Sequence, residues 1–232
     1  MDLGWTKKLW ILPPLLILLG FAALAVDLPV TAWFRAGKCP SELYKFVRLS
    51  EVVAEGHGVG MILLLIWVLD VARRRSLPRL VAASFGAGLL ADAVKLFIAR
   101  ARPNYFFNEL HGSNIFDSFR WQWSGLNSES SRWQSFPSAH VATGVGLAII
   151  LAWRYPRGRW LFFTFMVLAA TQRVADSYHF LSDVCWASAL GASMAWLCIR
   201  GPLGPVFDRF EAGNPLRQRE PYAPAAEVHP LS

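Results

Sequence analysis

Three short stretches of the sequence combine basic side chains with histidine, and each stretch lies beside a long apolar segment. They supply two arginines, a lysine, two histidines and an aspartate: Lys95, Arg102, His140, Arg173, His179 and Asp183. Guanidinium groups bind phosphate oxygens in pairs, and an ammonium group adds a point charge. Histidine can act as a nucleophile or a proton donor near neutral pH. This combination indicates phosphoryl transfer through a phosphorylated histidine, with basic side chains rather than a metal ion neutralising the phosphate oxygens.

The first stretch is predicted to place both of its basic residues on one face of a helix. Lys95 and Arg102 are seven residues apart, and at about 100° per residue they fall within about 20° of each other. Pro103 is expected to close this helix. Asp92, three residues before Lys95, is expected to pair with it in a structural role.

The other two stretches are predicted to lie at helix starts. Pro137 or Ser138 can begin a helix just before His140, which leaves backbone N–H groups free to bind an anion. Asp183 follows His179 by four residues. It can therefore orient the imidazole if both residues lie in one helical turn.

The composition indicates a membrane protein. The chain has 232 residues, of which 54% are hydrophobic and 17% are charged, and 23 Lys and Arg against 16 Asp and Glu give a net charge of +7. The mean hydropathy is +0.34, whereas soluble domains carry about a quarter charged residues. A soluble globular enzyme and a disordered chain are therefore excluded. A disulfide-stapled scaffold is excluded as well, because the sequence holds only 3 cysteines.

Six apolar segments approach the length of about 20 residues that crosses the hydrocarbon core. They cover residues 9–26, 57–72, 80–100, 138–153, 160–176 and 180–199. These segments predict an all-α, polytopic six-helix bundle in residues 1–200, followed by an irregular cytoplasmic tail at 201–232. The first segment also fits a secretory signal with a small-residue cleavage site at Ala23-Leu24-Ala25.

Arginine clusters after the second and fourth segments predict the orientation of the bundle. They are Arg73, Arg74, Arg75 and Arg79, and Arg154, Arg157 and Arg159. Short loops with such clusters face the cytoplasm, which puts both termini inside and the loops 27–56, 101–137 and 177–180 outside. All three basic stretches then meet at the outer face. The loop 101–137 is rich in aromatic residues, which favour either an interfacial anchor or a rim that guides a lipid headgroup into a site.

The three stretches resemble the signature motifs of the type 2 phosphatidic acid phosphatase (PAP2) superfamily, which also includes glucose-6-phosphatase and the vanadium haloperoxidases. The similar segments are Lys95-Leu-Phe-Ile-Ala-Arg-Ala-Arg102-Pro103, Pro137-Ser138-Ala139-His140 and Arg173-Val-Ala-Asp-Ser-Tyr-His179-Phe-Leu-Ser-Asp183. The resemblance extends over roughly residues 50–200, with the motif core at about 80–190. Ala139 stands where the family usually has glycine. Gln172 stands where it usually has serine, which removes a hydroxyl group from the third motif.

The resemblance implies a role for each motif residue. His179 attacks phosphorus, Asp183 orients the His179 imidazole, and His140 protonates the leaving oxygen. The remaining motif residues would hold the phosphate: Lys95, Arg102, Ser138, the N–H of Ala139, and Arg173. The resemblance also implies a PAP2/haloperoxidase-like core, a six-helix bundle in the membrane members, that hydrolyses lipid phosphates or diphosphates. Because the basic side chains neutralise the phosphate oxygens, we expect no metal ion or other cofactor.

We therefore expect an integral-membrane phosphatase that acts on a phosphorylated lipid at the periplasmic face of a bacterial inner membrane. A lipid phosphotransferase that uses the same phosphohistidine is one alternative. An anion or lipid transporter is another, but its site would lie near the midplane on broken helices rather than at helix ends. The expected partners are the bilayer and the lipid substrate, with no nucleic acid. His57 with Glu51 and Glu55 fits no familiar set of metal ligands.

Overall fold

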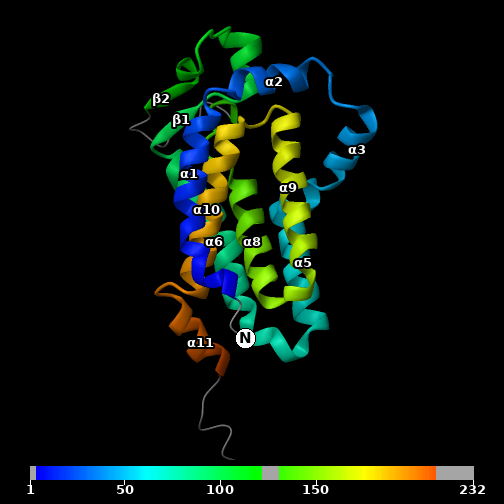
Figure 1. Ribbon diagram of the computed structural model, residues 1–232, viewed down its shortest axis with the longest axis vertical. Coiled ribbons are helices and arrows are strands. Elements are labelled where there is room, and N and C mark those ends of the chain that lie inside the picture. Colours follow the sequence, from blue (N-terminus) through cyan, green and yellow to red (C-terminus); the bar gives the residue numbers. More distant parts are fainter. Residues whose placement is uncertain (1–3, 122–130, 213–232) are drawn as a thin grey trace, which may run out of the picture.

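The protein folds into an elongated helical bundle in the computed structural model, which describes residues 4–121 and 131–212 (Figure 1). The long helices run side by side along the bundle axis. They are α1 (Leu12–Ala23), α5 (Gly56–Leu69), α6 (Leu77–Lys95), α8 (Ala139–Arg154), α9 (Arg159–Ala175) and α10 (Leu181–Ile199). The upper end of the bundle is the end drawn at the top of Figure 1, and the lower end is opposite it.

Helix α8 lies at the centre of the bundle and packs against α6, α9 and α10. Every residue from Val141 to Ala152 is buried. Small residues allow the neighbouring helices to approach closely, as is typical of membrane helix interfaces. A Cβ atom added at Gly146 would lie 2.1 Å from the carbonyl oxygen of Ala83 on α6, and one at Gly191 on α10 would lie 2.6 Å from that of Ala142. The backbone of α8 is therefore fixed from two sides.

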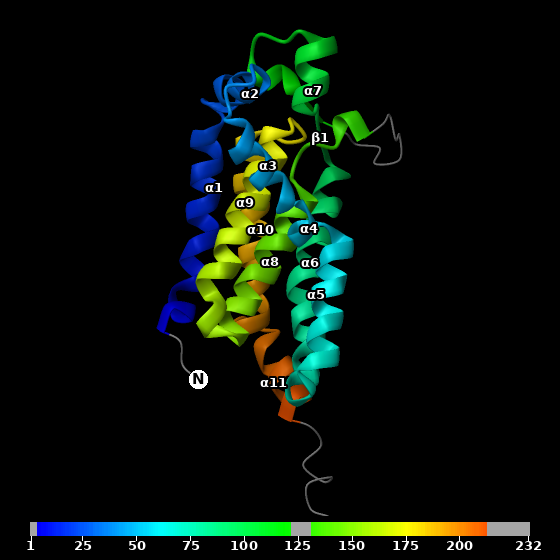
Figure 2. The same cartoon turned by 90° about the vertical axis from the view of Figure 1, so that its right-hand side faces the viewer.

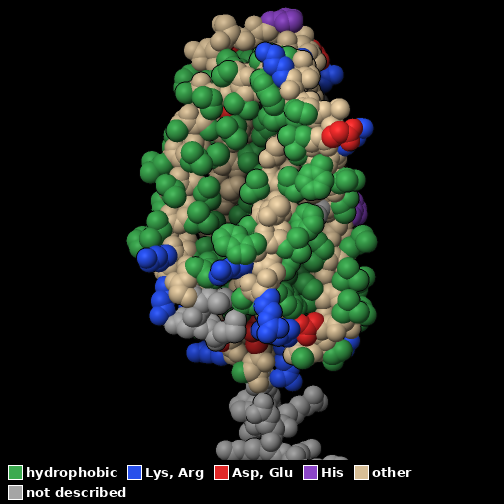
Figure 3. Space-filling model, turned by 45° about the vertical axis from the view of Figure 1, so that its right-hand side comes forward, with side chains coloured by type: hydrophobic (Ala, Val, Ile, Leu, Met, Phe, Trp, Pro, Cys, Tyr) green, Lys and Arg blue, Asp and Glu red, His purple; other side chains and the backbone are tan. Residues whose placement is uncertain are grey.

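Among the residues that the structure describes, three helical segments are long and apolar enough to cross a membrane: Gly4–Ala23, Val71–Lys95 and Leu181–Ile199. Helices α5 and α8 are shorter apolar helices. Figure 3 shows hydrophobic side chains spread broadly over the middle of the face in view. The prediction of a helical membrane protein is therefore confirmed. That six helices cross the bilayer stays a prediction.

The third apolar segment ends earlier than predicted. Helix α6 stops at Lys95, and Ile98–Arg100 forms strand β1, which pairs antiparallel with β2 (Phe119–Trp121). The prediction that Lys95 and Arg102 share one helix face is therefore wrong, and Pro103 begins the short helix α7 (Pro103–Tyr105) instead of closing α6. The cause is tertiary, because the N–H of Ser135 donates to the carbonyl of Arg100 and the N–H of Ala101 to that of Ser118.

Short elements cover the upper end of the bundle. Besides α7 and the two strands they are α2 (Asp27–Arg35), α3 (Ser41–Leu49), α4 (Glu51–Ala54), η3 (Phe106–Leu110), η4 (Ile115–Ser118) and η5 (Ser131–Trp133). Several of the loop aromatics form a second hydrophobic core here, with Phe106 and Phe180 fully buried and Trp133 nearly so. Phe116, by contrast, is 65% exposed, and Trp123 lies outside the described residues. The aromatic loop is thus partly a packed cover over the bundle.

The lower end holds both arginine clusters, the turns η2 (Val71–Ser76) and η6 (Pro156–Gly158), the 3₁₀ segment η1 (Gly4–Ile11) and helix α11 (Gly204–Ala212). The prediction that the tail is irregular is wrong for residues 204–212. Buried Arg79 on α6 binds Asp208 and Glu211 of α11. This pairing of a buried cation fixes α11 against the bundle.

Candidate active site

The three motifs come together at the upper end of the bundle, beneath α2 and α7 (Figure 2). Four of the motif residues sit at the end of a long helix. Lys95 ends α6, His140 lies in the first turn of α8, Arg173 in the last turn of α9, and Asp183 in the first turn of α10. His179 lies in the loop that joins α9 to α10. Helix ends thus bring residues far apart in sequence to one place.

Two arginines face the same tyrosine ring. The guanidinium carbon of Arg173 lies 4.7 Å from the centre of the Tyr178 ring, and that of Arg102 lies 5.6 Å from it. The Nε atom of each arginine is buried and has no hydrogen-bond partner among the described residues. Burial, and next the nearby charge of Arg173, lower the pKa of Arg102. Two adjacent cations with unused N–H donors form a site for an anion.

Arg173 is held in place by two neighbours. Its Nη1 donates to Glu51 Oε1 at 2.8 Å and to Gln172 Oε1 at 3.4 Å. Gln172 is buried and also donates to Asp176 at 2.6 Å. The glutamine that replaces the usual serine of the third motif therefore acts as a support for Arg173.

Lys95 adds a third positive charge near the two histidines. Its Nζ lies 2.9 Å from Asp92 Oδ1, which confirms the predicted pair. The charges of Lys95, Arg102 and Arg173 all act on His140 and on His179. The cluster is therefore compact enough for its members to influence one another.

The start of α8 adds backbone donors to the cationic group. Ser138 is the N-cap, and its buried hydroxyl accepts a hydrogen bond from the N–H of Val141 at 3.4 Å. The N–H groups of Ala139 and His140 are in the first turn, where no intrahelical acceptor exists. Such a helix start favours an anion.

His179 has a defined tautomer. Its Nδ1 lies 2.6 Å from the carbonyl oxygen of Ser135. Because a carbonyl can only accept, Nδ1 carries the proton, and Nε2 of the neutral ring keeps its lone pair. Burial lowers the pKa of this imidazole well below its usual value, the bond to Ser135 acts in the opposite direction, and the charge of Arg173 lowers it again. His179 is therefore an uncharged base with a free nucleophilic nitrogen.

Asp183 acts on His179 through Ser135. Asp183 Oδ2 accepts from the Ser135 hydroxyl at 2.6 Å and from the N–H of Phe180 at 2.9 Å. The expected arrangement within one helical turn is wrong, because His179 precedes Phe180, the N-cap of α10. The carboxylate instead fixes the residue whose carbonyl holds the imidazole.

Four residues around the site were not identified from the sequence: Asp27, Arg100, Ser135 and Tyr178. Arg100 is fully buried and contacts both Asp183 and Asp27. A signal existed for Asp27, since a carboxylate directly after an apolar segment requires a partner. Nothing in the spacing identifies that partner.

The acidic residues near His57 do not converge on it. His57 is 96% exposed and lies 3.9 Å from Glu55, whereas Glu51 is directed to Arg173. Within residues 4–121 and 131–212, no group of three His, Cys, Asp or Glu side chains could hold a metal ion.

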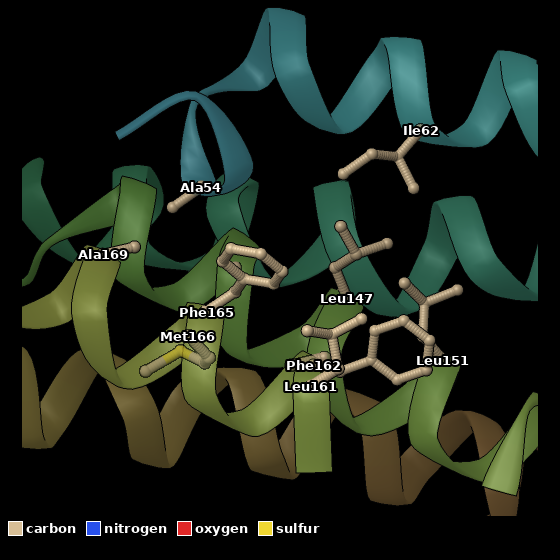
Figure 4. Close-up of a pocket in the computed structure, with 11 residues that line it drawn as sticks. Ala54, Ile62, Leu147, Leu151, Leu161, Phe162, Phe165, Met166 and Ala169 are labelled. Atoms are coloured by element: carbon tan, nitrogen blue, oxygen red, sulfur yellow. The ribbon is translucent and has the colours of Figure 1, made fainter. Parts of the chain in front are cut away.

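An apolar groove lies between α5, α8 and α9 (Figure 4), and it begins about one helical turn from His140 and Arg173. Its volume is about 200 Å³, and it is lined by Ala54, Ile62, Gly144, Leu147, Ala148, Leu151, Leu161, Phe162, Phe165, Met166 and Ala169. Gly144 follows His140 by four residues, and Ala169 precedes Arg173 by four. Each pair is therefore stacked on one face of its helix, about 6 Å apart along the axis. Leu161 and Phe165 are 56% and 37% exposed, so the groove opens on the side of the bundle.

Comparison with known proteins identifies relatives of this chain. The family model of the PAP2 superfamily matches residues 77–204. A lipid A 1-phosphatase of Rhizobium johnstonii is 32% identical over 135 residues, which are 57% of this chain and 51% of that protein. A lipid A 1-phosphatase of Rhizobium etli is 30% identical over 135 residues, 57% of this chain and 54% of that protein. The chain thus spans about half the length of these curated relatives. No solved structure matches it.

Proposed function

Because the chain belongs to the PAP2 superfamily, we propose that it is a membrane phosphatase that hydrolyses a lipid phosphate monoester or diphosphate through a phosphohistidine. One observation carries the proposal. Two arginines whose buried Nε donors are unused lie close enough to His179 for their charges to act on it, and the Nδ1 proton of this histidine is fixed by a carbonyl. A phosphate group would supply the missing acceptors and meet a ready nucleophile.

These positions support the following reaction. The Nε2 lone pair of His179 attacks phosphorus, an N–P bond forms, and the P–O bond to the lipid breaks while His140 donates a proton to the leaving oxygen. A water molecule then attacks the phosphorus and gives its proton to His140. The N–P bond breaks, inorganic phosphate leaves, and the lone pair returns to Nε2.

The phosphate is held throughout by fixed charges and dipoles. Arg102, Arg173 and Lys95 neutralise its oxygens, and the N–H groups at the start of α8 donate to it. These groups supply the charge that a metal ion would otherwise provide, so the reaction proceeds without a divalent cation.

The apolar groove is the proposed place for an acyl chain of the substrate. It starts one turn below the phosphate site, has an apolar lining and opens on the side of the bundle. A lipid that binds its phosphate among the arginines would direct a chain along this groove. The relatives are named lipid A 1-phosphatases, so a phosphorylated glycolipid is the first substrate to test.

The proposed location is a bacterial inner membrane, with the active site on the periplasmic side and both termini in the cytoplasm. The arginine clusters lie at the lower end and the site at the upper end of the bundle. The positive-inside rule then assigns the lower end to the cytoplasm.

A phosphate-release screen tests the function. The full chain is purified in detergent and given phosphatidate, phosphatidylglycerol phosphate, a polyprenyl diphosphate and a phosphorylated glycolipid, with His179→Ala as the control. We expect inorganic phosphate from at least one lipid, undiminished by EDTA and blocked by vanadate. Activity that EDTA removes and Mg²⁺ restores would contradict metal independence. Phosphate that appears on a second lipid instead of in solution would identify a phosphotransferase.

A further inference from the structure

We propose that Asp27 and Arg100 are positioning residues for the nucleophile His179. Together they link α2, the first short helix after the first apolar segment, to the start of α10 and to the loop between α9 and α10 that carries His179. The inference rests on the proposed function and extends it to residue 27, which lies outside the residues 77–204 that the family model matches.

Arg100 is built into the protein rather than directed at a substrate. Its side chain is fully buried, and its guanidinium carbon lies 4.3 Å from the ring centres of both Phe119 and Phe180. Nε donates to the Ser118 hydroxyl at 3.1 Å, and Nη1 donates to the Ser182 hydroxyl at 2.7 Å and to Asp183. Nη2 donates to Asp27 at 2.8 Å. All three guanidinium nitrogens are engaged, in contrast to those of Arg102 and Arg173, whose Nε atoms are unpaired within the described chain.

Asp27 completes the start of α10 from another part of the chain. Its Oδ1 accepts from the backbone N–H of Ser182 at 2.9 Å, and its Oδ2 accepts from the Ser182 hydroxyl at 2.5 Å and from Arg100. The N–H of Ser182 is in the first turn of α10, where no intrahelical acceptor is present. Asp27 is itself fully buried. It thus serves as a helix cap supplied by α2.

The contacts continue to the imidazole in two further steps. Asp183 accepts from the Ser135 hydroxyl, and the Ser135 carbonyl accepts from His179 Nδ1. Arg100 has two carboxylates as partners, Asp27 and Asp183. If Asp27 is removed, Arg100 and Ser182 lose a partner and are free to shift, and Asp183 and Ser135 shift with them. The Nε2 atom of His179 would then be misaligned with phosphorus, while Arg102 and Arg173 keep their own contacts.

The test compares Asp27→Ala and Asp27→Asn with a matched control, Thr31→Val. Thr31 is also fully buried on α2, four residues after Asp27, and its hydroxyl has no partner within the described residues. The full chain is assayed in detergent with an activated aryl phosphate for kcat and KM, with vanadate for occupancy of the phosphate pocket, and by thermal unfolding.

We expect Asp27→Ala to lower kcat by about 10- to 100-fold, the range found when a supporting residue behind an active group is lost. KM and the vanadate inhibition constant should stay within about twofold of the wild type, because the phosphate-binding residues are intact. Phosphohistidine should form more slowly in a single turnover. Asp27→Asn, which keeps an acceptor for Ser182, should recover part of the loss, and Thr31→Val should match the wild type.

Two outcomes overturn the inference. In one, Asp27→Ala keeps the wild-type kcat. In the other, KM, vanadate inhibition and kcat change together and in proportion to lost thermal stability, which marks a role in folding alone. If Asp27→Ala does not fold, Asp27→Asn and Arg100→Lys are assayed in its place. A lower kcat at unchanged KM then supports the inference, and an unchanged kcat overturns it. A wild-type protein that releases no phosphate and forms no phosphohistidine would instead contradict the proposed function.

Discussion

His179 and His140 can take different roles because their surroundings differ. His179 is buried, and the Ser135 carbonyl holds the proton on Nδ1, which leaves the Nε2 lone pair available for the proposed attack on phosphorus. His140 is partly exposed in the first turn of α8. From there it can exchange protons with the leaving group and with water. The two histidines are therefore expected to respond differently to the leaving group of the substrate.

Replacing each histidine with alanine separates the two roles. His179→Ala should abolish covalent phosphate labelling of the protein, because no N–P bond can form. His140→Ala should slow turnover by about 10²- to 10⁴-fold for a lipid with a poor alkoxide leaving group. An activated aryl phosphate should be partly spared, since its leaving group needs no proton. The measurement is acid-labile, base-stable labelling together with turnover on both substrates. Equal loss on both substrates would remove His140 from the general-acid role.

The pH dependence reports the protonation of His179. Only the neutral imidazole is a nucleophile, and its pKa is lowered well below the usual value, chiefly by burial. The neutral form therefore persists as the pH falls through about 6.5, the ordinary histidine value. With an activated aryl phosphate, kcat/KM should stay level through pH 6.5 and decline only in more acidic solution. The exposed His111 provides the control, since His111→Ala should leave the profile unchanged. A midpoint at or above pH 6.5 would contradict this assignment.

Helix ends are the elements that build the site. The starts of α8 and α10 and the ends of α6 and α9 converge at the upper end of the bundle. Hydropathy predicted these helices, and the positions of the arginine clusters predicted that the motifs meet at one end, because both signals are carried by local sequence. Spacing did not predict that Ile98–Arg100 forms a strand, since the partners of this segment are residues 119–121 and Ser135. The Asp27–Arg100 contact was missed for the same reason, as it joins residues 73 positions apart.

A larger side chain on α8 tests whether the groove binds an acyl chain. Ala148 is buried and lines the groove, so Ala148→Phe would occupy space proposed for an acyl chain. We expect KM for a long-chain lipid phosphate to rise, because each methylene displaced from an apolar site costs about 0.8 kcal/mol, or about fourfold in affinity. An aryl phosphate without a chain should be hydrolysed as before. Val167→Phe is the control, because Val167 lies on α9, is 61% exposed and does not line the groove. An equal effect on both substrates would show general damage to α8 instead.

Charged side chains gather at the two ends of the bundle. The arginine-rich turns η2 and η6 and helix α11 lie at the lower end, and the phosphate site lies at the upper end, with hydrophobic side chains between them (Figures 1 and 3). An apolar belt between two polar ends is the arrangement that a bilayer requires. In this arrangement the proposed phosphate site lies near the membrane surface, where a lipid headgroup is found.

Single cysteines can determine which end faces outward. In a background with Cys39, Cys185 and Cys198 replaced, Asn114→Cys at the upper end should react with an impermeant maleimide added to intact cells. Arg75→Cys and Arg157→Cys, in the two arginine-rich turns, should react only after permeabilisation, because positively charged short loops stay in the cytoplasm. All three positions are exposed, so a failure to react reports the side of the membrane rather than burial. Labelling of Arg75→Cys from outside would invert the orientation and move the phosphate site to the cytoplasmic face. The chemistry of His179 would be unchanged, but the lipids within its reach would be those of the inner leaflet.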